Sequence, residues 1–459
     1  MNAIEEFYLK SRPDNYFPDL IKNLNQLNQK LHAFNNINPN VKKNFLFSVK
    51  DNICVKNVET TASSKILKGY IPPFNATVVE KMLSKNFEFL GKTNMDEFGF
   101  GTFGLHSQEI PKNPFNEEYV AGGSSSGGAI ATSILKYHIA LVESTGGSIS
   151  APASFCGVVG FTPTYGTISR YGLIDYANSL DKIGIMGRSS NDIKYIFDIV
   201  KGPDNYDSTC IDINQKIKEK IPENKPDYDK QNTIFIINQV NDFIDEKIKS
   251  SFSNLITKLE NIGFNIKYID FNLLDKAIPT YYIISMAEAS TNLAKYTGFK
   301  YGLKNNDFSK YYNEFFTESR SNFGIEAKRR IILGTFVRSA SVKNKYYNKA
   351  LKVRGLLINK LKEILSKGFI LSPTMPIMTP KITDTENLSP IQNYGLDILT
   401  IPPNLCGFPH ISFPYDYINE MPLGAQLISD HFNDYSLLDF VEKWENQFKY
   451  KFKYNLGSL

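Results

Sequence analysis

The amino-acid sequence predicts an α/β fold, because short strand-like apolar runs alternate along it with segments of helical periodicity. Two further observations bound the architecture. The length of 459 residues allows about three average domains or one large domain with insertions. Hydrophobic residues make up 42% of the chain, which suffices for a sizeable core. No stretch reaches the ~18 consecutive apolar residues that a membrane-spanning helix needs, so we expect a soluble protein.

The first part of the chain begins the alternation. We expect residues 1–40 to form an N-terminal helical region, because leucine and isoleucine recur at three- and four-residue spacing within 16–34. Further patterns predict strands at 45–53, 87–94 and 136–144, and helices at 76–83 and 127–135. The segment from about 202 to 230 is rich in proline, asparagine, lysine and glutamate, so an exposed connection is expected there.

The second part continues the same alternation. It predicts a strand at 233–240, a helix at about 245–261 and a strand at 264–271. A long helical stretch is expected over 278–366. Two more strands and a final helix are predicted at 369–373, 424–429 and 435–448.

Charge and cysteine content exclude several classes of protein. The chain has 52 Lys and Arg against 47 Asp and Glu, and the net charge of +5 is spread along it, so composition gives no basic surface for nucleic acid. The four cysteines lie far apart without a CxxC pair, so neither a zinc site nor a disulfide framework is expected. The N-terminus shows no secretory or organellar signal. We expect a cytoplasmic protein, with a mitochondrial or plastid matrix as the alternative.

Two glycine patterns resemble known fingerprints without their structural context. Residues 99–104 spell G-x-G-x-x-G, but no strand leads directly into the first glycine and no helix is predicted to open at the last. Residues 123–127 spell G-x-S-x-G, the nucleophile elbow of α/β-hydrolases, and His410 or His431 follows in the required order. No hydrophobic strand precedes this elbow. A histidine-dependent hydrolase with Ser125 as nucleophile is therefore the weaker hypothesis.

Two serine- and glycine-rich segments, 121–129 and 144–166, carry a stronger signal. They flank a predicted helix and strand, and their glycines allow close backbone approach and N–H groups that point to one spot. An oxyanion hole requires such a spot. The only histidine between them, His138, falls inside the predicted strand. The base that we expect is Lys50, which ends a predicted buried strand, because burial favours the neutral amine.

Sequence segments in a fixed order carry a family resemblance. They are VKDNI at 49–53, GKTNMDEF at 91–98, GGSSSGG at 122–128, TGGSIS-PASFCGVVG at 145–160 and PTYG-ISRYG at 163–172. Together they resemble the amidase signature family of Ser-Ser-Lys amide hydrolases, over nearly the whole chain. The resemblance implies one amidase domain over residues 1–459. It also implies the amidase-signature fold, a large mixed β-sheet covered by helices on both faces.

The resemblance also implies the catalytic residues. Ser148 would be the nucleophile, Ser124 the bridging serine and Lys50 the base. The backbone N–H groups of the oxyanion hole would be those of Thr145, Gly146, Gly147 and Ser148. No metal ligand is implied.

Three further residues, Gly123, Arg330 and Asp397, would bind glutamine by the same resemblance. Arg330 would hold the α-carboxylate with two hydrogen bonds, and Asp397 would accept from the α-ammonium. One segment departs from the family, which commonly reads SDTGGSIRQPA where this chain has ESTGGSISAPA at 143–153. Ser144 and Ser150 stand there in place of an Asp and an Arg, which changes the hydrogen bonds expected around the nucleophile.

Within the family, segments 281–302, 324–336 and 397–414 resemble the A subunits of aspartyl/glutamyl-tRNA amidotransferases. This implies a protein that hydrolyses glutamine and supplies ammonia to amidate mischarged Glu-tRNA(Gln) or Asp-tRNA(Asn) within a heterotrimer. Its partners would be the B and C subunits: the B subunit would bind the tRNA, ATP and Mg²⁺, and the small C subunit would hold the other two together. This chain would then bind no cofactor itself. A stand-alone amidase acting on a small amide is the alternative, and the sequence does not decide between the two tRNA acceptors.

Overall fold

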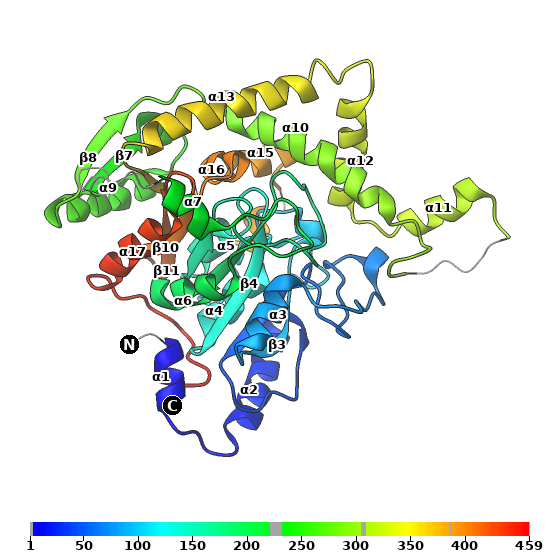
Figure 1. The fold of residues 1–459 in the computed structure, drawn as a ribbon, viewed down its shortest axis with the longest axis horizontal. Helices are drawn as coiled ribbons and strands as arrows, with labels where there is room; N and C mark the ends of the chain where they lie inside the picture. Colours follow the sequence, from blue (N-terminus) through cyan, green and yellow to red (C-terminus); the bar gives the residue numbers. More distant parts are fainter. Residues whose placement is uncertain (1–2, 221–231, 304–308, 386, 459) are drawn as a thin grey trace.

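A mixed β-sheet of eleven strands runs through the computed structural model, which describes residues 3–220, 232–303, 309–385 and 387–458 (Figure 1). The strands are β1 (Phe34–Ile37), β2 (Leu46–Lys50), β3 (Glu88–Thr93), β4 (His138–Ser144), β5 (Val159–Thr162), β6 (Lys182–Gly187), β7 (Thr233–Ile237), β8 (Asn265–Ile269), β9 (Phe369–Pro373), β10 (His410–Ile418) and β11 (Met421–Ile428). Their order is β1-β3-β2-β4-β6-β5-β10-β11-β9-β7-β8. Strand β2 lies parallel to β3 and β4, whereas β4 is antiparallel to β6. The predicted α/β class is confirmed.

Helices cover both faces of this sheet. On one face, α4 (Ser126–Ile134) lies so close to β4 that a Cβ on Gly128 would be 2.6 Å from Val142. On the other, α6 (Ser190–Val200) packs Ile193 against Gly187, where a Cβ would also lie 3.0 Å from Ile139 of β4. Val142 and Ile139 point to opposite faces because side chains alternate along a strand. The remaining α-helices are α1 (Ala3–Leu9), α2 (Tyr16–Leu31), α3 (Thr77–Ser84), α5 (Ser150–Phe155), α7 (Ile213–Lys220), α9 (Glu246–Asn261), α10 (Leu274–Asn292), α11 (Tyr312–Arg320), α12 (Ile325–Arg338), α13 (Tyr347–Leu365), α14 (Ile382–Thr385), α15 (Pro390–Gly395), α16 (Ile401–Cys406) and α17 (Asp434–Glu445).

Several strands that the sequence pattern does not predict are present, and each has a local reason. The N-terminal region is helical in α1 and α2, but its last part forms strand β1. The two polar residues Asn35 and Asn36 interrupt the alternation of apolar residues that would predict a strand there. Strand β6 includes Gly184 and Gly187, and β10 includes Pro414 beside a register shift. Glycine and proline weaken a strand pattern, although both are tolerated at irregular positions.

The helical stretch expected over 278–366 is divided into α10, α11, α12 and α13. α10 ends at Asn292, and Gly298 and Gly302 in the segment that follows have φ values of +86° and +62°. A left-handed backbone at these positions does not continue a right-handed helix. Helices α12 and α13 pack against α10, and α11 projects from the rest of the molecule (Figure 1).

The connection expected at about 202–230 is only partly an exposed loop. Its described part contains α7, and Ile213 at the start of that helix is fully buried. Residues 221–230 lie outside the described residues. Within the described ranges, no helix combines the length and apolarity needed to cross a membrane.

Candidate active site

Lys50, Ser124 and Ser148 form one buried hydrogen-bonded chain. Ser124 Oγ donates to Ser148 Oγ at 2.8 Å, and Lys50 Nζ donates to Ser124 Oγ at 2.8 Å. Lys50 and Ser124 are 0% exposed, whereas Ser148 is 6% exposed and lines an open cavity. A chain of this kind can move a proton from the outer serine to the lysine.

The fold brings these residues together at one edge of the sheet. Lys50 is the last residue of β2, and β4 lies parallel beside it, so the carboxyl ends of both strands meet. Ser124 lies just before α4, and Ser148 lies between β4 and α5. The backbone N–H of Ser125 donates to the carbonyl of Ser148 at 3.1 Å, which joins the two serine loops.

Two glycines let these loops approach their neighbours closely. A Cβ on Gly123 would lie 2.1 Å from Oδ2 of Asp96, and a Cβ on Gly147 would lie 2.4 Å from Oγ1 of Thr400. A side chain at either position would therefore displace the loop that carries a catalytic-site serine. The peptide bond after Gly123 is cis.

Backbone N–H groups around Ser148 remain available to a ligand. Those of Gly146, Gly147 and Ser148 donate to no acceptor among the described residues. They lie within the segment 145–148 that was expected to form the oxyanion hole. The hydroxyl of Thr145 is instead hydrogen bonded to carboxylates, at 2.7 Å from Glu143 Oε1.

Lys50 has a buried carboxylate beside it that the sequence does not predict. Its Nζ lies 2.8 Å from Oε2 of Glu143 and donates to the Glu143 carbonyl at 3.0 Å. Both side chains are buried. Lys50 and Glu143 therefore form a buried ion pair beside the two serines.

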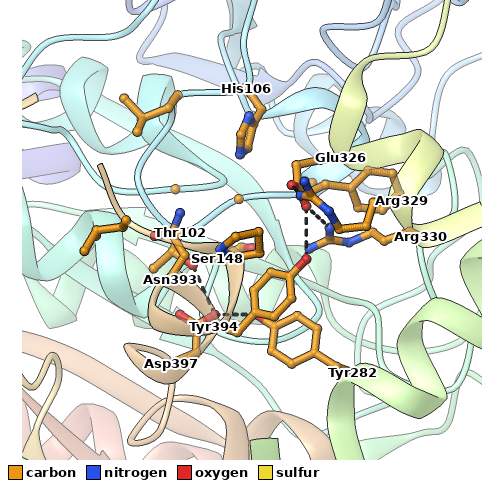
Figure 2. Close-up of a pocket in the computed structure, with 18 of the residues that line it drawn as sticks. Thr102, His106, Ser148, Tyr282, Glu326, Arg329, Arg330, Asn393, Tyr394 and Asp397 are labelled. Carbon is orange, nitrogen blue, oxygen red and sulfur yellow. Dashed lines mark hydrogen bonds and ion pairs between the residues drawn. The ribbon is translucent and has the colours of Figure 1, made fainter. Parts of the chain in front are cut away.

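A cavity of about 430 Å³ is lined by Ser148 together with the three residues that were expected to bind glutamine, Gly123, Arg330 and Asp397. Arg330 lies on one side of Ser148 and Asp397 on another, so both charged groups face the same space as the serine hydroxyl (Figure 2). A volume of this size fits a small-molecule substrate.

Asp397 offers one free carboxylate oxygen to that cavity. Its Oδ2 accepts from Thr102 Oγ1 at 3.1 Å and from Tyr282 OH at 3.0 Å. No described residue donates to Oδ1. Burial raises the pKa of Asp397 to about 6. The group is therefore ionised at neutral pH and can accept from an ammonium.

Arg330 is held from two sides. Its Nη1 donates to Glu326, and its Nε donates to Tyr176 OH at 3.3 Å. Glu326 also pairs with Arg329 and accepts from Tyr394 OH at 3.2 Å. Of the guanidinium nitrogens, Nη2 alone has no acceptor among the described residues. Nη1 keeps a second N–H besides the one that it donates to Glu326, so both terminal nitrogens of Arg330 can still donate to a ligand.

Comparison with known proteins decides the family. A family model for Amidase matches residues 22–438. The chain belongs to the amidase family. It is 39% identical over 469 aligned positions to the A subunit of the glutamyl-tRNA(Gln) amidotransferase of Sulfolobus acidocaldarius, covering 97% of this chain and 96% of that protein. The corresponding protein of Sulfurisphaera tokodaii is 37% identical, with 97% of each chain covered.

Solved structures share the fold of this amidase. The crystal structure of the glutamyl-tRNA(Gln) amidotransferase A subunit from Thermotoga maritima superposes with a TM-score of 0.80 at 32% identity, covering 97% of this chain and 94% of that one. A 6-aminohexanoate cyclic dimer hydrolase reaches 0.79 at 20% identity, covering 97% and 96% of the two chains, which is a likeness of fold alone. The expected amidase-signature fold is confirmed.

Ser144 and Ser150, which stand in place of the family's Asp and Arg, have different surroundings in this amidase. Ser144 Oγ donates to Oδ1 of Asn404 at 3.1 Å. Ser150 is buried, and its Oγ has no hydrogen-bond partner in the described part of the chain. Neither serine contacts Lys50 or Ser124 through a hydrogen bond among the described residues.

The alternative elbow at Ser125 does not gather the groups that a histidine-dependent hydrolase needs. Ser125 Oγ donates to the Glu143 carbonyl at 3.0 Å. His410 is hydrogen bonded to Asn404, and His431 Nε2 lies 3.1 Å from a carbonyl oxygen in the same segment. Neither histidine is hydrogen bonded to Ser125 among the described residues.

The G-x-G-x-x-G pattern at residues 99–104 does not form the turn between a strand and a helix that binds dinucleotides. Residues 99–104 are a loop, and no helix opens at Gly104, whose N–H donates to Asp96 Oδ2 at 3.1 Å. Glycines of this loop line the cavity instead. Within the described ranges, no group of three or more His, Cys, Asp or Glu side chains could hold a metal ion.

Several residues of the site are absent from the sequence prediction. Thr102 and Tyr282 hold Asp397, but both lie far from it in the sequence, and no local pattern marks these contacts. The sequence could have predicted the contact of Glu326 with Arg330, because Glu326 stands four residues before Arg330 on α12, which is the spacing of a helical ion pair. Glu143 stands within the 143–153 segment, but its contact with Lys50 depends on how β2 pairs with β4.

Proposed function

We propose that this amidase is the glutaminase subunit of a tRNA-dependent amidotransferase. The observation that carries the proposal is the shared cavity: Ser148, backed by Ser124 and Lys50, faces the same space as Arg330 and Asp397. A nucleophile, a cationic group and an anionic group around one small cavity suit a free amino acid that bears a side-chain amide. The extended similarity to amidotransferase A subunits supports the same substrate.

The acylation step follows the hydrogen-bonded chain. With Lys50 as the amine, Nζ accepts the proton of Ser124, Ser124 Oγ accepts that of Ser148, and Ser148 Oγ bonds to the amide carbon of glutamine. The amide oxygen becomes an oxyanion. Backbone N–H groups of residues 145–148 would stabilise it, at about 3 kcal/mol per donor in comparable sites.

The remaining steps reverse the proton movement. The ammonium of Lys50 returns a proton through Ser124 to the amide nitrogen, the carbon–nitrogen bond breaks and ammonia leaves. Water then attacks the glutamyl ester, and its proton takes the same route to Lys50. Glutamate departs as Ser148 Oγ regains a proton, which restores the starting site.

Charge at the two cavity walls would orient glutamine for this attack. Oδ1 of Asp397 accepts from the α-ammonium, and Nη2 of Arg330 donates to the α-carboxylate. The side-chain amide then points toward Ser148. Gly123 lines the cavity, where a larger residue would collide with Asp96.

The proposal includes an assembly of this amidase with a B subunit and a C subunit. The ammonia would pass to the B subunit, which would bind the mischarged tRNA, ATP and Mg²⁺, while the C subunit would hold the other two together. Glu-tRNA(Gln) is the acceptor in the names of the relatives, and Asp-tRNA(Asn) is the second acceptor to test. The cytoplasmic location stays a prediction.

The test begins with glutamine. We expect the protein in the assembly that co-purifies from its own cell to release ammonia and glutamate, and we expect Ser148→Ala to abolish both. Ser150→Ala is the matched control, because it removes a hydroxyl from the same segment that has no described partner. Ammonia release that persists in Ser148→Ala would refute the assignment of the nucleophile.

A second assay separates the proposal from a stand-alone amidase. With ATP, Mg²⁺ and glutamine, the assembly should convert mischarged Glu-tRNA(Gln) or Asp-tRNA(Asn) to the amidated form. The alternative is favoured if small amides are hydrolysed faster than glutamine and neither tRNA is amidated. Fold does not separate the two, since a cyclic dimer hydrolase shares it.

A further inference from the structure

The catalytic-site lysine of this amidase has a buried carboxylate neighbour, Glu143, which takes no part in the proton path from Ser148 to Lys50. Glu143 lies on β4, and its Oε2 is 2.8 Å from Lys50 Nζ. Its side chain is 1% exposed, so water does not screen the pair.

Glu143 is itself held in place. Asn52 Nδ2 donates to its Oε2 at 3.2 Å, and Thr145 Oγ1 lies 2.7 Å from its Oε1. The same Thr145 hydroxyl lies 2.7 Å from Oδ1 of Asp181. A hydroxyl has one proton, so it can donate to only one of two carboxylates. One of the two carboxyl groups must therefore carry a proton and donate to Thr145.

The negative charge rests on Glu143 rather than on Asp181. Glu143 faces the Lys50 ammonium, whereas Asp181 has no ion-pair partner among the described residues. Burial, together with the charge of Glu143, raises the pKa of Asp181 well above its ordinary value. Asp181 therefore holds a proton more readily than an ordinary aspartate, and Glu143 is the carboxylate that pairs with Lys50.

Asp96 lies near Lys50, and Lys182 lies near Asp181 and Glu143, but both make their hydrogen bonds to the backbone outside this cluster. Lys182 on β6 donates to the carbonyls of Leu180 and Asn404, at 3.0 Å each. Asp96 accepts from the N–H groups of Gly104 and His106, at 3.1 Å and 2.8 Å. Lys50 and Glu143 are therefore the only ion pair within this cluster among the described residues.

We propose that Glu143 is a positioning residue that increases the basicity of Lys50. The inference rests on the proposed function. The negative charge of Glu143 stabilises the ammonium form of Lys50 at two stages. In the resting site, Lys50 must lose a proton to solvent before it can act as the base, and Glu143 opposes that loss. During acylation, Lys50 takes the proton of Ser124, and Glu143 favours that transfer. Glu143 therefore raises the pH at which the enzyme becomes active, and makes Lys50 a more effective base above that pH.

The test is the pH profile of kcat/KM for glutamine in the co-purified assembly, measured by ammonia release. We expect Glu143→Gln to move the midpoint of the rising limb to lower pH by about 1–3 units, the effect of one close opposite charge. The plateau should fall as well, because a weaker base is less effective. Glu143→Asp, which keeps the charge, should retain a midpoint near that of the original protein.

Three further variants keep the inference refutable. Glu143→Ser also removes the charge and should shift the midpoint like Glu143→Gln, so the inference can still be tested if one of the two variants fails to fold. Asp181→Asn should leave the midpoint nearly in place, since an amide matches a protonated acid in charge. Glu363→Gln removes an exposed carboxylate from α13 and controls for net charge.

The outcomes are distinct. An unchanged midpoint in both Glu143→Gln and Glu143→Ser would overturn the inference while leaving the glutaminase intact. A midpoint shift in Asp181→Asn as large as that in Glu143→Gln would mean that the charge of Asp181 also acts on Lys50, and would overturn the assignment of that charge to Glu143 alone. Loss of the plateau without any shift would mean a structural role only. Absence of ammonia release from the original protein would instead refute the proposed function.

Discussion

The ammonium end of the cavity gives the sharpest test of substrate recognition. Asp397 is 7% exposed, and its Oδ2 is occupied by the hydroxyls of Thr102 and Tyr282, so Oδ1 remains for the substrate. Asp397→Asn keeps the size of the side chain and removes its charge. A hydrogen bond to a charged group contributes about 1.5–3 kcal/mol, which corresponds to a rise of about 10- to 150-fold in the glutamine KM.

Steady-state glutaminase assays measure the glutamine KM and kcat that this prediction concerns. We expect kcat to change by only a few fold, because Ser148, Ser124 and Lys50 remain in place. Asp384→Asn is the matched control, since it makes the same chemical change at an exposed position on nearby α14. An unchanged KM in Asp397→Asn would refute the ammonium assignment. A collapse of kcat at constant KM would refute it too, because Asp397 would then act on the chemical step.

The remaining predictions concern protonation and the identity of the base. Because burial raises the pKa of Asp397 to about 6, it loses its charge as the pH falls through that value; the glutamine KM should rise there, and this rise should disappear in Asp397→Asn. A KM independent of pH on both sides of 6 would contradict this reasoning. Lys50→Ala should abolish ammonia release, whereas His431→Ala and His410→Gln should retain it. Activity in Lys50→Ala, together with its loss in a histidine variant, would instead support Ser125 as the nucleophile.

The sequence predicts six of the eleven strands within their bounds. They are β2, β3, β4, β7, β8 and β9, which all lie within predicted strands. The pattern fails at β6 and β10, where Gly184 and Pro414 interrupt the apolar run, although neighbouring strands hold both segments in the sheet. Tertiary pairing, which the sequence does not display, decides these cases.

Prediction of the site divides in the same way. Lys50, Ser124 and Ser148 belong to segments with a recognisable order of residues, so their identity comes from local sequence. The contact between Lys50 and Glu143 depends on the parallel register of β2 and β4. Likewise, Tyr282 reaches Asp397 across 115 positions of sequence. Contacts of this kind become visible only when the chain is folded.

The site combines two parts of the chain, and this division has a consequence for specificity. The proton path lies between residues 50 and 148, on the central strands and the loops that follow them. The charged walls of the cavity come from Arg330 and Asp397, near α12 and α15. A change in the second part can therefore alter the substrate while leaving the proton path intact. This division predicts that substitutions at Asp397 act on KM, whereas substitutions at Glu143 act on the pH profile.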